Sequence, residues 1–515
     1  MDSSRLLKFG YFPKELPPPF TTKAFARFVK SSKFPDIPQS YASRSCIHTL
    51  ARPGNQRRTL SIPNPFNYYL LCKTLADNRS QVAQQFKRST ISVSKPVIDA
   101  NDFRAYLPSV KGRDLPKERA KIRVGGRYIV RADISRFYHS VYTHSIPWAL
   151  NGKAIAKRSR THGFANLLDK CIRNLQDSQT LGIPVGPDAS FIVSELICCA
   201  IDEEIQKFGF KGFRFVDDFE FSFLTRGEAE QAISTIESIL REYELALNPL
   251  KTHIDELPTP FEYPWKTRVK RFNFSEKARS SQILEYFNLL FELHKANRNE
   301  PVLRYGIARL KSAKFKDERL LADLLFQCIL VEPGTLREVF FVVDRLGIQI
   351  KEDKLSEIVH HLISIHGGLK HGSEVAWALW IAILYEIRLS GNAISSLRNF
   401  DDDIVALLAL HAYRRGLVRS GVVDNWRHLI SKDSLRNGHW LLAYEANLRE
   451  SRWVEGKNTI ENCELFSALN KRNVSFYDEN VNFIMRKDWI SDTYDAIEDS
   501  DDDADDEDEE DDGIS

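Results

Sequence analysis

The chain has 515 residues, of which 43% are hydrophobic and 11% aromatic, so disorder throughout is excluded and a sizeable core is expected. The formal net charge of +2 hides an asymmetry, because 15 of the 70 acidic residues and none of the 72 basic residues lie in 492–515. The rest of the chain sets 72 basic against 55 acidic residues, a charge of +17. This distribution favours a polyanionic partner.

No segment of the sequence predicts membrane insertion. The longest apolar run, Val375–Tyr385, has 11 residues, fewer than the ~18 that indicate a transmembrane helix. Residues 1–12 lack the apolar core of a signal peptide, so we expect a cytoplasmic protein without a membrane partner. The seven cysteines include no C-x-x-C pair, which favours buried free thiols over disulfides or a structural zinc site.

The first half of the chain reads as α+β. Residues 1–60 contain a proline-rich piece and basic pieces, and we expect them to lead into a domain over 61–270. In that domain, strand-like runs alternate with helical patterns and turn signals. The expected strands are 128–134 and 212–223, and the expected helices are 189–205 and 227–247.

After about residue 276 the pattern becomes helical throughout, with turn signals between the segments. Successive helix pairs predict an all-α domain of HEAT-like repeats over 271–491. The acidic tail, 492–515, has nothing to bury and is expected to be disordered. The predicted helical segments include 302–311, 318–331, 335–345, 352–366, 373–389, 402–415 and 435–450.

Two segments place acidic residues at strand ends. Asp133 ends an apolar strand, and Asp217 and Asp218 interrupt a strand of alternating phenylalanines. An uninterrupted strand would bury Asp217 on the phenylalanine face, which is very costly for an unpaired carboxylate. We therefore expect a hairpin with Asp217 and Asp218 at its apex and a cation that compensates their charge. Because the pair lacks the glycine of a tight hairpin, this turn needs support from elsewhere.

Three such carboxylates suit nucleotidyl transfer. Two Mg²⁺ ions ~3.5–4 Å apart can activate an attacking oxygen and stabilise a leaving pyrophosphate. Mg²⁺ takes oxygen ligands, usually carboxylates together with substrate phosphates. The plainer alternative for an Asp-Asp pair is a solvated turn, and the order of the surrounding motifs disfavours it.

Five segments lie in a fixed order over about 60–260, and together they resemble the motifs of reverse transcriptases. They correspond to the fingers motif, the first palm motif, the Gly-Ile-Pro-x-Gly motif, the Tyr/Phe-x-Asp-Asp metal box and the Leu-Asn-x-x-Lys-Thr box. In this sequence they are Leu60–Pro65 (LSIPNP), Asp133–Tyr138 (DISRFY), Gly182–Ser190 (GIPVGPDAS), Phe215–Asp218 (FVDD) and Leu247–Thr252 (LNPLKT).

The resemblance implies a palm and fingers fold and assigns roles residue by residue. Asp133, Asp217 and Asp218 would bind Mg²⁺, or Mn²⁺ in its place. Lys251 would donate a proton to the pyrophosphate or stabilise its charge, the alternative being a solvated surface lysine. The implied nucleotide-binding residues are Ile134 and Ser135 through their backbone, Tyr138 as the steric gate that selects deoxynucleotides, and Gly182, Pro184 and Gly186.

Two of these assignments keep alternatives. The alternative for Tyr138 is a core aromatic residue. A basic fingers residue should clamp the triphosphate, and of the candidates Lys111, Arg113, Arg119 and Lys121 we name Arg119.

One departure from the family pattern matters. Templated members carry glutamine where this chain has Val185, and valine cannot hydrogen-bond a template strand or a base. The Gly-Ile-Pro-Val-Gly-Pro variant, followed by Glu195 and by a long helical region, resembles the bacterial abortive-infection (Abi) phage-defence reverse transcriptases. That resemblance implies untemplated DNA synthesis that starts on a protein tyrosine, and a homo-oligomer.

The predicted function is therefore a DNA polymerase of the reverse transcriptase family in antiviral defence by abortive infection. Its partners would be dNTPs and a single-stranded DNA product, covalently attached if a tyrosine primes synthesis. The priming residue should lie on a mobile N-terminal segment, where Tyr11 and Tyr41 are candidates, and we favour Tyr41. The alternatives are a templated RNA-directed DNA polymerase that uses an associated RNA, and a non-catalytic scaffold.

The histidines of the helical region invite a metal interpretation. His360, His361, His366 and His371 are spaced by 1, 5 and 5 residues, which does not repeat a helical face, and there is no H-E-x-x-H. The spacing therefore favours structural roles for these side chains.

Overall fold

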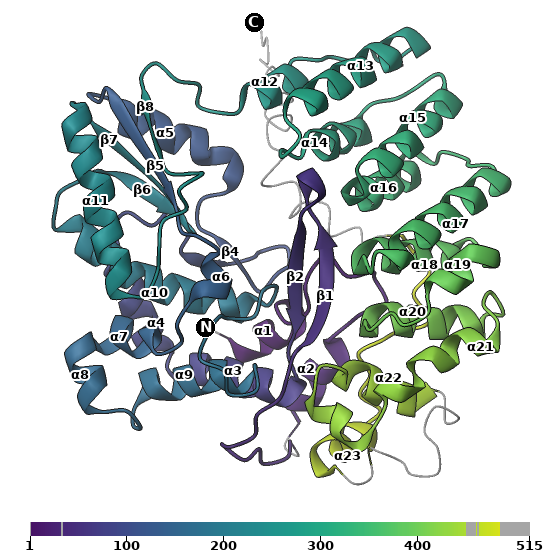
Figure 1. The fold of residues 1–515 in the computed structure, drawn as a ribbon, viewed down its shortest axis with the longest axis horizontal. Helices are drawn as coiled ribbons and strands as arrows, with labels where there is room; N and C mark the ends of the chain where they lie inside the picture. Colours follow the sequence, from purple (N-terminus) through teal and green to yellow (C-terminus); the bar gives the residue numbers. More distant parts are fainter. Residues whose placement is uncertain (1, 32–33, 450–459, 461–462, 485–515) are drawn as a thin grey trace, which may run out of the picture.

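The computed structural model describes residues 2–31, 34–449, 460 and 463–484 (Figure 1). This described part of the chain is mixed α and β, with helices in the majority and three small sheets. The acidic tail predicted for 492–515 lies outside the described residues.

A four-stranded antiparallel sheet holds the segments with the acidic residues. Its order is β6-β7-β5-β8, and β5 pairs with β7 so that Asp133 lies directly opposite Asp218. The predicted strand 212–223 is divided by a turn into β6 and β7, as expected for a hairpin. The strands are β5 (Tyr128–Asp133), β6 (Lys211–Phe215), β7 (Asp218–Phe223) and β8 (His253–Glu256).

Helices surround this sheet. The long helix α10 (Asp188–Gln206) and α11 (Arg226–Glu242) match the predicted helices within a few residues, and α11 packs on β5 and β7. The remaining helices of this part are α5 (Leu115–Arg123), α6 (Phe137–Ser140), α7 (Ser145–Asn151), α8 (Lys153–Arg158) and α9 (Phe164–Asn174).

The N-terminal part adds a long hairpin and its supporting helices. Strands β1 (Cys46–Ala51) and β2 (Arg57–Ile62) pair in antiparallel register, and their hairpin runs between the sheet and the later helices (Figure 1). The other elements are α1 (Ser3–Phe9), α2 (Lys23–Val29), α3 (Pro65–Asp77), α4 (Arg79–Lys87) and the short pair β3 (Pro96–Ile98) and β4 (Tyr106–Pro108).

From residue 264 to 470 the described chain is helical, and we name this region the helical arc (Figure 1). Its helices begin and end close to the predicted segments. They are α12 (Pro264–Lys270), α13 (Ser280–Ala296), α14 (Val302–Arg309), α15 (Glu318–Val331), α16 (Leu336–Leu346), α17 (Glu352–Gly368), α18 (Gly372–Leu384), α19 (Gly391–Ser396), α20 (Asp403–Arg414), α21 (Ser420–Val423), α22 (Trp440–Arg449) and α23 (Glu464–Asn470).

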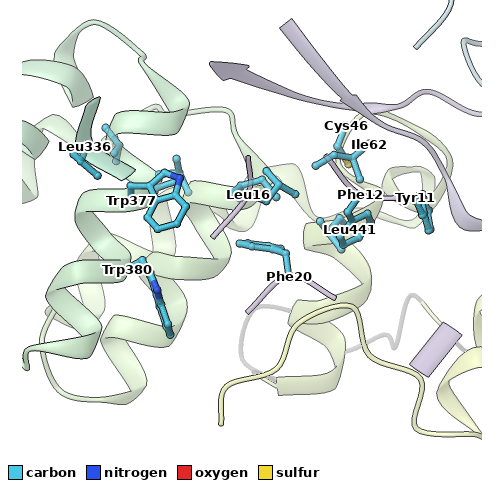
Figure 2. Close-up of a cluster of buried hydrophobic side chains, with 14 of the residues drawn as sticks. Tyr11, Phe12, Leu16, Phe20, Cys46, Ile62, Leu336, Trp377, Trp380 and Leu441 are labelled. Atoms are coloured by element: carbon cyan, nitrogen blue, oxygen red, sulfur yellow. The ribbon is translucent and has the colours of Figure 1, made fainter. Parts of the chain in front are cut away.

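The helical arc and the N-terminal part share one apolar core, part of which is drawn in Figure 2. The indole N–H of Trp440 donates to the carbonyl of Ile62 at 3.0 Å, and that of Trp377 donates to Glu15 at 3.0 Å. The buried cluster includes residues on both sides of positions 60 and 270. The core therefore does not mark a domain boundary at either position, and both boundaries stay predictions.

The apolar run Val375–Tyr385 forms the greater part of α18, whose residues are buried from Gly372 to Ile383. This helix packs between α17, α20 and β1, which explains its hydrophobicity on all sides. No helix among the described residues combines the length and apolarity needed to cross a bilayer. The described cysteines are free thiols and, apart from half-buried Cys463, all are buried.

The core makes a pH-dependent contribution to stability through His411 on α20. This ring contacts the Tyr477 hydroxyl at 2.9 Å, and burial together with Arg415 and Arg414 lowers its pKa to about 4. The unfolded chain takes up the proton near pH 6.5, so stability falls as the pH drops from 6.5 toward 4, by about 2 kcal/mol at pH 5. We expect His411→Gln to lose less stability than the wild type between pH 7.5 and 5 in urea unfolding. Equal losses in both proteins would contradict this assignment.

Candidate active site

Three carboxylates meet at one end of the four-stranded sheet, and we name Asp133, Asp217 and Asp218 the acid cluster. Asp133 ends β5, Asp217 lies in the β6–β7 turn, and Asp218 begins β7. One carboxylate oxygen from each lies within 4.8 Å of the other two. Asp133 is buried, Asp217 half-buried and Asp218 exposed, so the cluster opens to solvent on one side.

The β6–β7 turn adopts a strained backbone. Its two residues are Val216 and Asp217, because Phe215 already pairs with Asp218. Val216 has φ +57°, a left-handed conformation that is unfavourable for a β-branched residue. Two contacts from outside the turn hold it, since the Val216 N–H donates to Ser94 Oγ at 2.8 Å and its carbonyl accepts from Arg214 Nη1 at 2.7 Å. The expected hairpin and its external support are both confirmed, but its apex is Val216 and Asp217, and Asp218 already belongs to β7.

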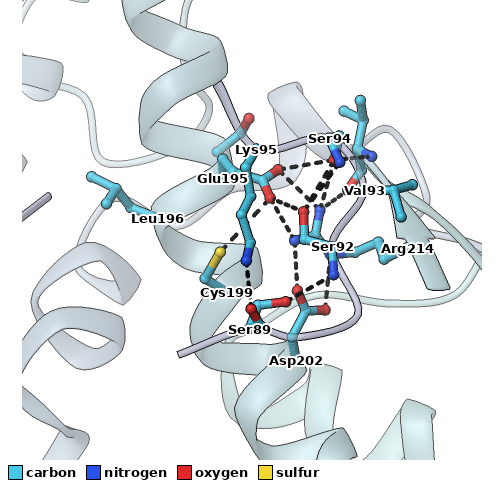
Figure 3. A network of polar contacts seen from close by, with 12 residues as sticks. Ser89, Ser92, Val93, Ser94, Lys95, Glu195, Leu196, Cys199, Asp202 and Arg214 are labelled. Atoms are coloured by element: carbon cyan, nitrogen blue, oxygen red, sulfur yellow. Dashed lines mark hydrogen bonds and ion pairs between the residues drawn. The ribbon is translucent and has the colours of Figure 1, made fainter. Parts of the chain in front are cut away.

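A buried ion network supplies this support (Figure 3). Arg214 on β6 is 0% exposed, and its guanidinium pairs with Glu195 at 2.8 Å and with Asp202 at 2.6 Å. Glu195 also accepts hydrogen bonds from Ser92 and Ser94. We name these five residues the arginine network. It connects β6 and the turn that contains Asp217 to α10, through two acidic residues that lie two helical turns apart.

The segment that precedes β8 lies against Asp133. The Asn248 side chain donates to Asp133 Oδ2 at 2.9 Å, and Lys251 Nζ lies 3.2 Å from Oδ1. Partial burial opposes the charge on Lys251, but the carboxylates of Asp133 and Asp218 outweigh it and raise the pKa of the lysine. Lys251 is therefore a cation beside the acid cluster.

The acid cluster carries more negative charge than the neighbouring Lys251 neutralises. Burial and then the charge of Asp133 raise the pKa of Asp217. Desolvation, followed by the charges of Asp217 and Asp133, raises the pKa of Asp218 to about 7. Oxygen donors this close with an excess of negative charge fit Mg²⁺ or Mn²⁺, because a bound cation would relieve their repulsion.

The predicted sugar-selecting residue lies near the acids. Tyr138 is half-buried, and its hydroxyl is 3.3 Å from Ser194 Oγ. Burial, with a smaller effect from Asp217, raises the pKa of this phenol, so Asp217 is within electrostatic reach. The Tyr138 carbonyl accepts the Ile183 N–H at 2.7 Å, which joins the first palm motif to the Gly-Ile-Pro segment.

The glycines of that segment have different surroundings. Gly182 has φ +84° and is buried behind the backbone of His139. Gly186 has φ +120°, and a Cβ there would meet the Pro13 ring at 2.7 Å. Pro184 between them is buried. Gly186 is thus required by contact with the N-terminal segment, a role that the sequence did not indicate.

The donors of two predicted phosphate contacts have acceptors within the protein in this structure. The Ile134 and Ser135 amides already donate to Asp217 and Ala246 carbonyls, at 3.2 and 2.8 Å. Arg119, named as the triphosphate clamp, instead pairs with Glu220 at 2.6 Å and donates to the Phe261 carbonyl at 2.8 Å. In this structure these donors stabilise the fold, because their acceptors lie on adjoining strands and loops.

The tyrosines favoured for priming are also placed differently from the prediction. Tyr41 is 4% exposed and packs against Phe66 and under the Arg436 guanidinium. Tyr11 is 0% exposed, and its hydroxyl donates to the Pro63 carbonyl at 2.6 Å. Both are anchored because the N-terminal segment belongs to the core, so neither hydroxyl is available to a nucleotide in this structure.

The structure adds site residues that sequence reasoning missed. Arg52 and Arg58 on the β1–β2 hairpin lie within electrostatic reach of the acid cluster: burial and Arg58 lower the pKa of Arg52, while Asp217 and Asp133 oppose that effect. Arg214 was missed too, although a charged residue inside the alternating Phe-Arg-Phe strand was a usable signal.

The chain matches no protein-family model and no curated protein. Among solved structures it is similar to the apo telomerase of Candida tropicalis, with 11% identity, a TM-score of 0.31, and coverage of 69% of this chain and 66% of that one. It is also similar to the telomerase of Candida albicans in complex with a TWJ fragment of telomeric RNA, with 12% identity, a TM-score of 0.28, and coverage of 75% and 69%. Likeness at this level assigns neither fold nor activity, so function is argued from the site.

Removing the arginine of the network should destabilise the whole protein. Arg214→Met leaves Glu195 and Asp202 buried without their cation, and breaking such a pair costs about 3–5 kcal/mol. Urea unfolding measures this loss. The matched control is Arg127→Met, which removes a solvent-exposed pair with Glu256 and should change stability little. Similar losses in the two variants would contradict the structural role of the network.

The acid cluster should bind a divalent cation through all three carboxylates. We expect Mn²⁺ at 100 times its dissociation constant to stabilise the wild type by about 2.7 kcal/mol. Asp217→Asn should lose this gain yet lose no stability without metal, because the substitution removes a repelling charge. Thermal unfolding with and without Mn²⁺ measures both effects. Glu256→Gln, an acid outside the cluster, serves as control, and Mn²⁺ stabilisation that persists in Asp217→Asn would refute the site.

Proposed function

We propose that this protein is a DNA polymerase of the reverse transcriptase family that acts in antiviral defence by abortive infection. The observation that carries the proposal is the meeting of three separate sequence motifs in one place. Asp133 comes from the first, Asp217 and Asp218 from the second, and Lys251 from the third, and the lysine lies 3.2 Å from Asp133. A solvated Asp-Asp turn would need neither the opposing carboxylate nor the cation.

The proposed reaction joins a hydroxyl oxygen to the α-phosphorus of a deoxynucleotide and breaks the bond to pyrophosphate. Mg²⁺, or Mn²⁺, held by the acid cluster would supply activation of the hydroxyl and stabilisation of the leaving group. The hydroxyl proton goes to solvent. Lys251 in its charged form faces the same acids and is suited to donate a proton to the pyrophosphate or to neutralise it. Asn248 holds the Asp133 carboxylate in place.

The proposal also states which nucleotides the site accepts and whether synthesis uses a template strand. The Tyr138 ring would exclude a 2′-hydroxyl and so select dNTPs. Val185 cannot hydrogen-bond a template, which supports synthesis without one; its carbonyl instead accepts the Ser61 N–H at 2.8 Å. We propose a single-stranded DNA product attached to a protein tyrosine other than Tyr11 or Tyr41, whose hydroxyls are buried.

The domain plan of the proposal follows the resemblance. Palm and fingers would occupy 61–270, with 1–60 leading into them, and the helical arc would be the HEAT-like repeat domain of 271–491. We further propose a homo-oligomer that works in the cytoplasm.

The test uses the full chain with Mg²⁺ and labelled dNTPs, without primer or template. We expect label that stays with the protein on a denaturing gel, grows into a nuclease-sensitive ladder and shifts on protease treatment. Asp217→Asn and Asp133→Asn should each reduce incorporation by more than about 100-fold, because even indirect partners of a metal cost 10- to 100-fold. Glu256→Gln should remain active.

The other outcomes discriminate between the alternatives. Incorporation only with an added primer and template would replace the untemplated mechanism with a conventional RNA-directed polymerase. Folded protein that incorporates nothing under either condition would overturn the enzymatic proposal in favour of a scaffold.

A further inference from the structure

The helical arc contains a second group of side chains of the kinds that bind metals. They line a cavity and lie far from the acid cluster in sequence. His366 ends the buried face of α17, His371 precedes α18, and Glu374 lies in the first turn of α18. One ligand atom from each lies within 4.8 Å of the other two. We name these three residues the histidine cluster.

The distances within the histidine cluster suit one ion. His366 Nδ1 is 3.0 Å from His371 Nδ1, and Glu374 Oε1 is 3.8 Å from the first and 3.4 Å from the second. Ligand atoms about 2.0–2.1 Å from a tetrahedral Zn²⁺ are separated by about 3.4 Å. Two imidazoles and a carboxylate are also a donor set that Zn²⁺ takes.

A chain reversal brings the two histidines together. The helix α17 ends at Gly368, Lys370 adopts φ +58°, and the His371 N–H donates to the His366 carbonyl at 2.9 Å. The spacing of five residues disfavoured a shared site only because that argument assumed a continuous helix. The structural role predicted for His366 and His371 therefore rested on a helix that stops between them.

The carboxylate of the histidine cluster is fixed by other groups. Glu374 is 3% exposed, and both of its oxygens accept from the Arg57 guanidinium on β2. Ser373 Oγ also donates to Oε2 at 2.6 Å. A carboxylate oxygen has two lone pairs, so Oε1 can accept from Arg57 and still bind a cation. Arg57 thus acts as the kind of outer partner that orients metal ligands.

The cluster faces open space. It lines a cavity of about 820 Å³ between the β1–β2 hairpin and the helical arc. His294 and Glu332 line the same cavity, where Nδ1 of the one lies 3.5 Å from Oε2 of the other. The opening to this cavity leaves room for a water molecule as the fourth ligand to an ion at the histidine cluster.

We propose that the histidine cluster binds one transition-metal ion, best Zn²⁺, through His366, His371 and Glu374, with its fourth position open to the cavity. The ion replaces the Nδ1–H···Nδ1 hydrogen bond between the two rings. Both rings turn about their soft χ2 torsions to aim their Nδ1 lone pairs at it, and the single proton of the donor ring moves from Nδ1 to Nε2 through solvent. The pair releases no net proton.

The bound ion would fix the turn between α17 and α18, which already contacts the hairpin. The Gly372 N–H already donates to Thr49 Oγ1 at 2.9 Å, and the Ala51 N–H donates to Ser373 Oγ at 3.2 Å. Fixing the α17–α18 turn therefore fixes the hairpin that carries Arg52 and Arg58. The proposal does not depend on polymerase activity, because the acid cluster contributes no ligand to it.

The experiment measures metal binding by the full chain after chelation. Zn²⁺ content after dialysis and the visible absorption of Co²⁺ as its surrogate are the readouts. We expect one tightly bound Zn²⁺ and the intense absorption of four-coordinate Co²⁺. His371→Ala and His366→Gln should each lose both signals. His361→Ala, which removes an exposed histidine of α17, and Asp217→Asn, which damages only the acid cluster, should keep them.

The outcomes that overturn the proposal are equally direct. Failure of the wild type to retain Zn²⁺ would leave the two rings as a proton-sharing pair only. Retention by folded His371→Ala and His366→Gln would place the ion elsewhere, and loss in Asp217→Asn would place it at the acid cluster. Thermal unfolding of the metal-free variants verifies that each is folded, and His371, the more exposed ring, is the safer substitution.

Discussion

The acid cluster depends on a buried ion pair more than on any residue of its own. Asp217 lies in a strained two-residue turn, with Asp218 directly after it and Asp133 opposite. These three carboxylates repel one another and would open the hairpin if nothing held it. Arg214 prevents this from behind, because the same guanidinium that pairs with Glu195 and Asp202 also binds the Val216 carbonyl. The long-range contacts of β6 with α10 therefore fix the geometry of a solvent-facing site.

The β1–β2 hairpin is the second constraint, because it connects the two halves of the protein. One side of it carries Arg52 within electrostatic reach of the acids. Its other side is anchored to the helical arc by the His48 pair with Asp402 at 2.8 Å and by the Arg57 pair with Glu374. Both pairs are largely shielded from water, where a polar group that loses its partner is costly. The position of the hairpin beside the acids is thus set by contacts more than 300 residues away in sequence.

Local patterns predicted what is local in this structure. The strand that ends at Asp133, the turn near Asp217 and most helices of the arc follow from alternation, periodicity and turn residues within short windows. The arginine network was not predictable in this way, because Ser94, Glu195 and Arg214 are brought together only by the fold. The burial of Tyr41 was not predictable for a related reason. A proline-rich segment does not show by itself that Tyr11, Leu16 and Phe20 fill a core whose other half comes from the helical arc (Figure 2).

This shared core also indicates the structural role of the helical arc. A separate appendage would bury its own apolar faces, but Trp377 and Trp440 bury theirs against residues before position 63 and donate hydrogen bonds to their backbone. Without the arc, the hairpin would lose both its apolar cover and the partners of His48 and Arg57. The acids would remain in the sequence, but the arginines facing them would have no fixed place. The helical arc is therefore part of the structure that positions the candidate active site.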